Sequence, residues 1–196
     1  MRKLFLLLFF ITGFFSSQTW GADFDKGSAA YKSGDYETAL KEWTPFAEQG
    51  VSKAQYNLGQ FYRLGLGVPQ NYRTAVKWYT LSAKQGDAPS QSNLGVIYNK
   101  GSGVPQDFKT AAKWYTLAAE QGFAEAQTNL SIMFALGNGV RRDTVYAYMW
   151  ANLGRSNGEG TAGKVIDLLV KEMTLSQIEK AQDLAQERIK KNYKGC

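Results

Sequence analysis

The sequence contains no histidine. Serine–histidine–aspartate triads, cysteine–histidine pairs and the usual catalytic zinc sites all require an imidazole, so none of these centres can form in this chain. The Ser-x-x-Lys motif, which supplies a nucleophile and a base without histidine, is absent too. We therefore expect a protein that is not an enzyme and that carries no cofactor or metal.

Cysteine is almost absent: Cys196 is the only one, and it is the last residue. A lone thiol cannot close an internal disulfide, so the fold must be held together by packing. We expect an idle, frayed terminus; an intermolecular bridge or a reactive thiol is the alternative.

Only one long hydrophobic run occurs, Leu4–Phe15, which follows Arg2 and Lys3 and precedes the polar string SSQTWGA. This order is typical of a secretory signal, so we expect residues 1–21 to be a signal peptide that is cleaved before Ala22. The alternative is an uncleaved anchor, but the run is too short to cross ~30 Å of hydrocarbon as a helix. The sequence thus predicts a periplasmic or secreted protein without a stable membrane anchor after cleavage.

A strong charge bias is also missing. The chain has 23 basic and 17 acidic residues, a formal charge of +6, and removal of Arg2 and Lys3 leaves 21 basic residues and a charge of +4. The basic residues form no clustered stripe and alternate with acidic ones, whereas phosphate backbones require clustered cations. We expect no nucleic-acid partner.

What the sequence does contain is repetition. Residues 75–86 read AVKWYTLSAKQG, and residues 111–122 read AAKWYTLAAEQG. Fainter copies, ALKEWTPFAEQG at 39–50 and AYMWANLGRSNG at 147–158, keep the same offset of 36. Four copies in fixed register indicate a repeat array.

Each 36-residue unit predicts two helices. In the twelve-letter block, apolar residues fall at i, i+3, i+4, i+7 and i+8, which is one face of a helix, here called helix B. The segment that follows each block has apolar residues four apart and predicts a second helix, helix A; these residues are Leu58, Leu94 and Leu130, then Tyr62, Tyr98 and Phe134.

The residues between the helices predict where each helix stops and starts. Glycine can adopt the left-handed conformation that ends helix A, and an Asn or Asp oxygen can cap the start of helix B. The glycines are Gly65, Gly101 and Gly137, and the caps are Asn71, Asp107 and Asp143. Gly86 and Gly122 should end helix B.

The repeated aromatic residues predict a core that runs from repeat to repeat. No helix pair can bury its aromatic face alone, so we expect stacked repeats to form a continuous seam of Trp78, Tyr79, Trp114, Tyr115 and Trp150. The tryptophans are then core residues and not a stacking platform for bases. Small residues beside the leucines, Gly59, Gly95 and Ser131, should allow helices to cross closely.

The ends of the array differ from its middle. Residues 22–52 predict a shorter helix pair with Gly34 and Asp35 in its turn and with Pro45 disturbing the second helix. Residues 159–196 predict capping helices, one at about 162–173 and one that begins with Thr174 and Gln177 in capping-box spacing. The apolar stripe of the last helix is Ile178, Ala181, Ala185 and Ile189.

The string GEGTAGK at 158–164 fits most of a phosphate-binding loop. Val165 stands where that motif has Ser or Thr, and a helix instead of a strand precedes it. We interpret the string as a flexible link between the array and its cap.

The pattern AxxNLGxxYxxGxGVPQDxxxAxxWYxxAAEQG resembles the Sel-one-like repeat (SLR), a relative of the tetratricopeptide repeat. Residues 53–158 carry three copies, and 89–122 is nearly complete. The third copy departs from the pattern at Ser131, Arg141, Arg142 and Thr144. The resemblance implies an all-α, right-handed α-solenoid whose helix A residues line a concave face, with a tetratricopeptide-like pair in front. It also implies an adaptor, similar to periplasmic scaffolds and regulators of envelope signalling or assembly.

On such a face, polar side chains opposite the Leu and Tyr stripe are free to bind a protein or peptide partner. The candidates are Lys53, Tyr56, Asn57, Gln60, Arg63, Ser92, Asn93, Asn99, Lys100, Thr128 and Asn129. The repeated Asn side chain can bond an extended peptide, and the cations can attract carboxylates. The alternative is that this Asn is structural and bonds a neighbouring helix or loop.

We expect a monomeric, non-enzymatic scaffold in the cell envelope. A cell-wall glycan-binding or accessory factor for an envelope enzyme is the second hypothesis, because exposed tyrosines and amides can grip sugar rings. RNA binding by helical repeats is a third, and the expected signal sequence argues against it.

Overall fold

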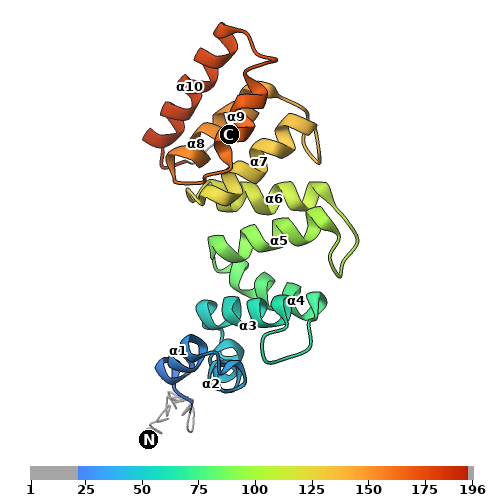
Figure 1. Ribbon diagram of the computed structural model, residues 1–196, viewed down its shortest axis with the longest axis vertical. Coiled ribbons are helices and arrows are strands. Elements are labelled where there is room, and N and C mark those ends of the chain that lie inside the picture. The colour runs from blue at the N-terminus through green and yellow to red at the C-terminus, as the bar shows by residue number, and fades with distance from the viewer. Residues whose placement is uncertain (1–21, 194–196) are drawn as a thin grey trace, which may run out of the picture.

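The computed structural model describes residues 22–193, which form ten α-helices and no strands (Figure 1). The expected all-α solenoid is confirmed. The expected signal peptide and Cys196 lie outside the described residues. The helices are α1 (Phe24–Ser33), α2 (Tyr36–Glu48), α3 (Ser52–Leu64), α4 (Tyr72–Lys84), α5 (Ala88–Lys100), α6 (Phe108–Ala119), α7 (Ala124–Leu136), α8 (Thr144–Ser156), α9 (Ala162–Leu169) and α10 (Leu175–Lys190). Within 22–193 no helix is long and apolar enough to traverse a bilayer.

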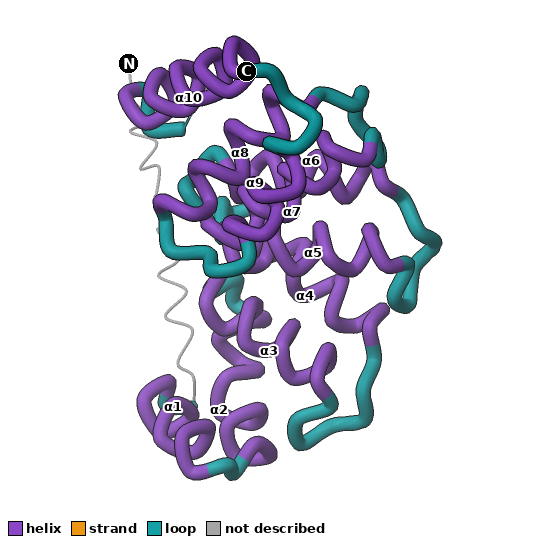
Figure 2. Tube along the Cα trace, turned by 45° about the horizontal axis from the view of Figure 1, so that its top comes forward, coloured by secondary structure: helices purple, strands orange, loops and turns teal. Residues whose placement is uncertain are grey.

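The helices stack in chain order. The three A helices are α3, α5 and α7. Each packs against its own B helix, α4, α6 or α8, and against the helix that precedes it in the chain, α2, α4 or α6. Successive A helices also touch each other. Figure 2 shows the long loops between A and B helices projecting along one edge of the stack. The A helices therefore form one continuous layer.

The predicted caps are present. Gly65, Gly101 and Gly137 end the A helices with φ of +73°, +70° and +74°, and each N–H bonds a carbonyl of the last turn. The side chains of Asn71 and Asp107 accept hydrogen bonds of 3.0 Å from backbone N–H groups in the first turn of the next B helix. Asp143 caps α8 in the same way.

Small residues set the distance between the A and B helices. A Cβ at Gly59 would lie 2.6 Å from the ring of Tyr79, and one at Gly95 would lie 2.5 Å from the ring of Tyr115. The rings are buried against these glycines, as the sequence predicted. In the third repeat Ser131 replaces the glycine, and its hydroxyl donates to the carbonyl of Ala147 at 2.7 Å. Ala151 of this repeat occupies the position of Tyr79 and Tyr115. Its small side chain leaves room for Ser131.

The aromatic seam runs across the repeat boundaries. Trp78 of α4 packs against the core cluster formed by α1, α2 and α3. Trp114 of α6 packs against the cluster formed by α4 and α5, and Trp150 of α8 is completely buried in the C-terminal cluster. Trp78 and Trp114 are only partly buried.

The N-terminal pair is closed by a buried carboxylate. Glu42 of α2 is 4% exposed. It accepts hydrogen bonds from the Lys26 ammonium at 2.5 Å and from the Asp23 N–H at 2.9 Å. The expectation that Pro45 disturbs α2 was wrong, since the helix continues to Glu48. Pro45 lies in the last turn, where loss of one N–H interrupts little of the helix.

The C-terminal cap differs from the prediction in two ways. Helix α9 ends at Leu169, well before residue 173. Helix α10 begins with the predicted capping box of Thr174 and Gln177, and it packs against α8. Ile189 is 41% exposed, so its place in the apolar stripe was wrong.

Arg188 takes the place expected for Ile189. It is 5% exposed, and its guanidinium carbon lies 4.4 Å from the ring centroid of Trp150. The aliphatic stem of an arginine can cover apolar surface while its planar head stacks on an aromatic ring. The packing of α10 on α8 thus buries Arg188 and leaves Ile189 exposed.

Candidate partner-binding surface

The exposed side of the A helices, together with the matching sides of α1 and α9, forms one surface, here called the A face. A hollow of about 300 Å³ lies at its N-terminal end, between α1 and α3. Four of the predicted site residues line it: Lys53, Tyr56, Asn57 and Gln60. The structure adds Ser28, Tyr31 and Lys32 from α1 and Trp43 from α2. We call this group the N-terminal hollow.

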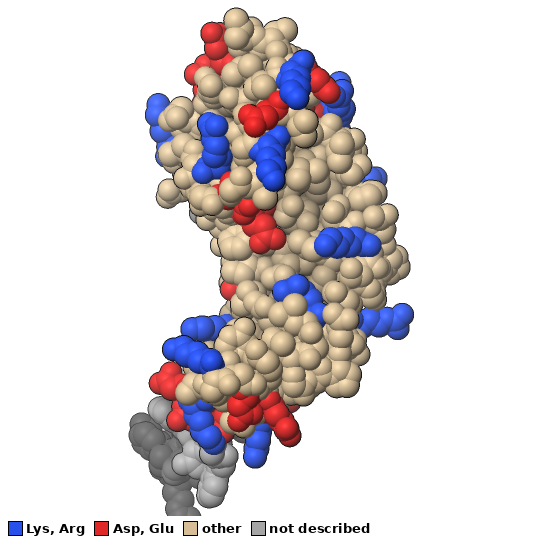
Figure 3. Space-filling view, viewed as in Figure 1, with Lys and Arg blue, Asp and Glu red and all other residues tan. Residues whose placement is uncertain are grey.

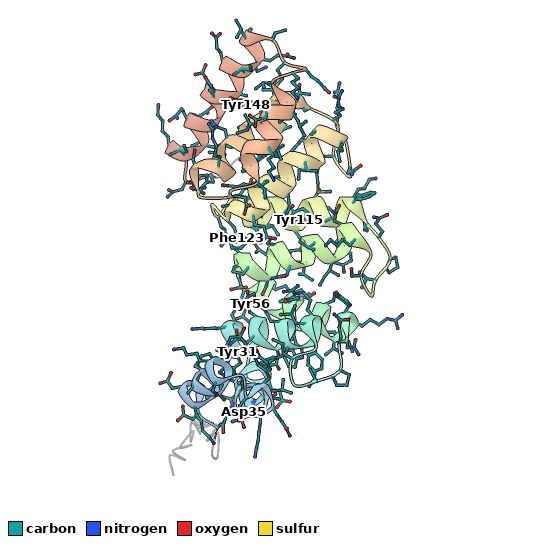
Figure 4. The ribbon with its side chains drawn as sticks, in the orientation of Figure 1. Tyr31, Asp35, Tyr56, Tyr115, Phe123 and Tyr148 are labelled. Carbon is teal, nitrogen blue, oxygen red and sulfur yellow. The ribbon has the colours of Figure 1, made fainter. Side chains whose placement is uncertain are left out.

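The N-terminal hollow combines rings, amides and two lysines. Tyr31 is 42% exposed, and Figure 4 shows it beside Tyr56 on the neighbouring helix. The Gln60 amide donates a hydrogen bond to the Tyr56 hydroxyl. Burial is the main cause that raises the pKa of Tyr56, so its hydroxyl stays protonated. The hollow therefore offers neutral donors and acceptors beside cations.

The side chains that line the N-terminal hollow carry a net positive charge. Lys32 and Lys53 both line it, and no Asp or Glu does. The Lys53 ammonium lies 5.5 Å from the ring centroid of Phe24. Elsewhere on the face that Figure 3 presents, both signs of charge are interspersed. The hollow suits an acidic or amide-rich segment.

The other predicted cations and amides follow the A face towards α7. Arg63 is half-buried and donates from Nε to the Tyr79 hydroxyl at 3.2 Å, so part of its hydrogen-bonding capacity is taken up. Asn99 is half-buried, and its carbonyl accepts a bond of 2.8 Å from the Gln106 amide. Lys100 is exposed at the end of α5.

The repeated asparagines are half-buried on their own helices. The Asn93 amide donates to the Pro89 carbonyl one turn earlier, at 2.9 Å. The side chains of Asn57 and Asn129 make no hydrogen bond within residues 22–193. Bonding to a neighbouring helix or loop, the structural role considered from sequence, is therefore not seen for any of the three.

Ser92 and Thr128 correct the prediction. They are only 2% and 3% exposed, so neither is free to meet a partner. This register faces the B helix of the same repeat, as the third repeat shows: a Cβ at Gly154 of α8 would lie 3.3 Å from the Thr128 N–H nitrogen.

A second hollow, of about 670 Å³, lies at the C-terminal end of the A face between α7 and α9. We call it the C-terminal hollow, and sequence reasoning missed it. Its lining residues are Ile132, Ala135, Leu136, Arg142, Val165, Leu168, Leu169, Lys171 and Glu172. The available signal was the register: Ile132 and Leu168 stand 72 and 108 positions after Gln60, so apolar residues replace an amide on the same face.

Three buried glutamines were also missed, although they recur at the period of 36. Gln55, Gln91 and Gln127 are at most 4% exposed. Their amides donate to carbonyls at the end of the preceding B helix, at 3.0 to 3.1 Å. They hold repeats together and do not reach the A face. Within residues 22–193 no group of acidic, Cys or His side chains is arranged to hold a metal ion.

Comparison with known proteins gives a family model and similar solved structures. A family model described as the Sel1 repeat matches residues 52–87, 88–123 and 124–161. The crystal structure of a Sel1 repeat protein from Oxalobacter formigenes is similar, with 34% identity and a TM-score of 0.70 over 74% of this chain and 60% of that one. A search of curated proteins finds no match.

A second solved structure is a protective antigen present in uropathogenic Escherichia coli strains, which displays an SLR fold. It is 29% identical with a TM-score of 0.54, over 87% of this chain and 46% of that one. The present chain therefore spans less than two thirds of the length of either structure.

Proposed function

Because the chain belongs to the Sel1 repeat family, whose members mediate protein–protein interactions, we propose that it is a non-enzymatic adaptor that binds a protein or peptide along the A face. The N-terminal hollow is the first point of contact. The observation that carries this proposal is the convergence of Lys53, Tyr56, Asn57 and Gln60 with Tyr31 and Lys32 from another helix. Residues scattered along the sequence thus share one concave site.

The chemistry of the hollow indicates the kind of segment it binds. Hydrogen-bonding amides fit an extended backbone, the exposed Tyr31 ring adds apolar contact, and two lysines favour acidic side chains. An extended, acidic peptide segment satisfies all three. The unpaired amides of Asn57 and Asn129 supply further hydrogen bonds along the same face.

The test is a pull-down from envelope extract with residues 22–196 as bait, since this form contains every helix of the described structure. The variant bait carries Lys32→Glu and Lys53→Glu. The control bait carries Lys77→Glu and Lys84→Glu, which change the charge equally on α4, in the layer of B helices. Circular dichroism checks that all three are folded.

Capture by the unmodified and control baits, with at least about a tenfold loss for the variant, supports the proposal. The captured protein is then purified, and its affinity for the three baits is measured by calorimetry. Equal capture by all three baits would show that binding lies elsewhere. Capture lost with the control alone would place it on the B helices.

A glycan-binding role is the second candidate. Tyr31 is 42% exposed next to the amides of Asn57 and Gln60, an arrangement that can stack on and hydrogen-bond a sugar ring. Saturable binding to purified cell wall, lost on Tyr31→Ala and kept in Tyr193→Ala, would favour this role. Absence of saturable binding would remove it.

We also propose that the protein acts in the periplasm or outside the cell, as a monomer. The support for this location is the apolar run Leu4–Phe15 after Arg2 and Lys3. Mass spectrometry of the protein recovered from the periplasmic fraction should find Ala22 at the N-terminus. Recovery of the full-length chain from the membrane fraction would show an uncleaved anchor instead.

A further inference from the structure

The side chains exposed on the A face change character along the stack. At one register, three positions after the repeated Asn, the residues are Gln60, Val96, Ile132 and Leu168. At the register of the Asn itself, Asn57, Asn93 and Asn129 give way to Val165. The A face is therefore polar where it begins and apolar where it ends.

The C-terminal cap leaves this apolar end of the A face exposed. Each regular A helix packs against a B helix of its own repeat. Helix α9 packs against α8 and α7, and α10 packs against α8. Leu136 is 64% exposed and Leu168 is 65% exposed, beside the C-terminal hollow.

Charges at the rim of the C-terminal hollow are mainly positive. Arg142 forms an ion pair of 2.8 Å with Glu172, which neutralises both in part. Lys171 also lines the hollow and has no acidic partner among residues 22–193. An occupant therefore meets apolar walls next to one uncompensated cation.

We propose that the C-terminal hollow binds a partner segment in which bulky apolar side chains stand next to an acidic one. The apolar side chains cover Ile132, Leu136 and Leu168, and the carboxylate meets Lys171. Desolvation of exposed leucines supplies affinity, and the charge fixes direction. The inference deepens the proposed function, because it gives the same A face a second, chemically distinct contact.

Segments of this chain itself fit the hollow poorly. The residues before Ala22 include an apolar run, but their charged residues are Arg2 and Lys3, which Lys171 would repel. Tyr193 lies against Gly122 and Asn157. Gly122 precedes the start of α7, whereas Leu136 is the last residue of that helix. If two copies paired through this hollow, Lys171 of one copy would approach Lys171 of the other, and the two ammonium groups would repel each other.

The first test uses the dye 1-anilinonaphthalene-8-sulfonate, which joins aromatic rings to one anionic group. Titrated into residues 22–196, it should bind at one site with enhanced fluorescence. Leu136→Ser with Leu168→Ser should weaken binding by at least about tenfold. The matched control is Leu81→Ser with Leu117→Ser, which removes two leucines that are each 45% exposed on B helices.

The second test reads the charge preference. Two labelled ten-residue peptides share a Leu-Phe core, followed by Asp-Glu in one and by Lys-Lys in the other, and their affinities are compared by fluorescence anisotropy. The acidic peptide should bind at least about fivefold more tightly, and Lys171→Glu should abolish this preference. Lys77→Glu on α4 is the control and should keep it.

Unaltered dye and peptide binding in the leucine variant would overturn the inference, and so would equal affinity for the two peptides. Sedimentation of the unmodified protein covers the other occupant: a dimer that disappears in the Leu136→Ser, Leu168→Ser variant would show that a second copy fills the hollow. The variant with Lys32→Glu and Lys53→Glu is measured alongside. If only this lysine variant loses partner capture, and the leucine variant keeps it, the proposed contact at the N-terminal hollow is supported and the one at the C-terminal hollow is rejected.

Discussion

The side-chain amide of Gln121 donates a hydrogen bond of 2.7 Å to the side-chain oxygen of Gln91. Gln91 in turn donates to the carbonyl of Ala83, at the end of the preceding B helix, at 3.1 Å. The same arrangement recurs in the neighbouring repeats. A ladder of amides thus connects three repeat junctions, and each buried glutamine adds a second donor to a carbonyl that already accepts from the N–H of the turn glycine.

The amide ladder predicts a large effect of Gln91→Leu. The substitution removes two hydrogen bonds of a buried side chain, the one that Gln91 donates to the Ala83 carbonyl and the one that it accepts from the Gln121 amide. The free energy of unfolding should therefore fall by about 1–3 kcal/mol. Urea denaturation followed by circular dichroism measures it. The exposed end of the same bond supplies the control: Gln121→Ala should cost less than about 1 kcal/mol. Equal stability of Gln91→Leu and the unmodified protein would show that the ladder adds nothing.

The contact between Gly95 and Tyr115 predicts that even one methyl group is not tolerated. A Cβ at residue 95 would lie 2.5 Å from the tyrosine ring, and the ring is 2% exposed. Gly95→Ala should therefore lower the unfolding free energy by about 1–3 kcal/mol, because the ring or the helix must move. Gly163→Ala in α9, where a Cβ meets nothing within 4 Å, is the control. Thermal melts measure the stability of both variants, and only Gly95→Ala should melt at a lower temperature than the unmodified protein.

The third repeat suggests how that clash can be relieved. Ser131 and Ala151 occupy there the registers of Gly95 and Tyr115. In a double-mutant cycle, Gly95→Ser should cost less in the Tyr115→Ala background than in the unmodified protein, by about 1 kcal/mol or more. Additive costs would mean that the two residues are not coupled.

Arg188 predicts that the cap depends on a cation as well as on apolar packing. The guanidinium stacks on Trp150 and donates to the Tyr193 carbonyl at 3.1 Å. Arg188→Met keeps much of the side-chain volume but should destabilise the protein by about 1–3 kcal/mol and speed amide exchange in α10. Lys190→Met, at an exposed position two residues away, should change neither. Unchanged exchange in the arginine variant would contradict the role.

The buried carboxylate of α2 predicts a pH effect. The hydrogen bond from Lys26, followed by that from the Asp23 N–H, holds the pKa of Glu42 below its ordinary value of 4.5. A lowered pKa stabilises the fold above the unfolded-state value, and this stabilisation is lost as the pH falls through the folded-state value. The unmodified protein should therefore lose stability more steeply than Glu42→Gln between about pH 5 and pH 3.

Urea titrations at each pH measure this difference. Glu48→Gln on the same helix is the control, since its carboxylate is exposed. Between about pH 6 and pH 8 both proteins should have flat profiles, because the chain has no histidine to titrate there. A constant difference between the Glu42→Gln variant and the unmodified protein at every pH would contradict the assignment.

Part of the candidate site could be predicted from the sequence. The rest depended on which side of its helix faces a neighbouring helix. Lys53, Tyr56, Asn57 and Gln60 were predicted from their offset to the leucine stripe, and they share one hollow. Ser92 was assigned to the same face by the same rule, yet it is buried. A helical stripe has a blurred edge, about 100° per residue, and only the position of the adjacent B helix decides on which side of that edge a residue falls.

By itself, the sequence determined the helices, their caps and their order. These follow from local rules, such as a glycine after Leu64 or an asparagine before Tyr72, and the period of 36 repeats those rules until only a stack of helix pairs can bury the aromatic residues. The tertiary structure alone decided that α10 packs on α8, that Arg188 covers Trp150, and that Leu136 and Leu168 stay exposed beside a hollow. The reason is physical: a helix is set by residues within one turn, whereas the face it buries is set by whichever distant helix fits against it.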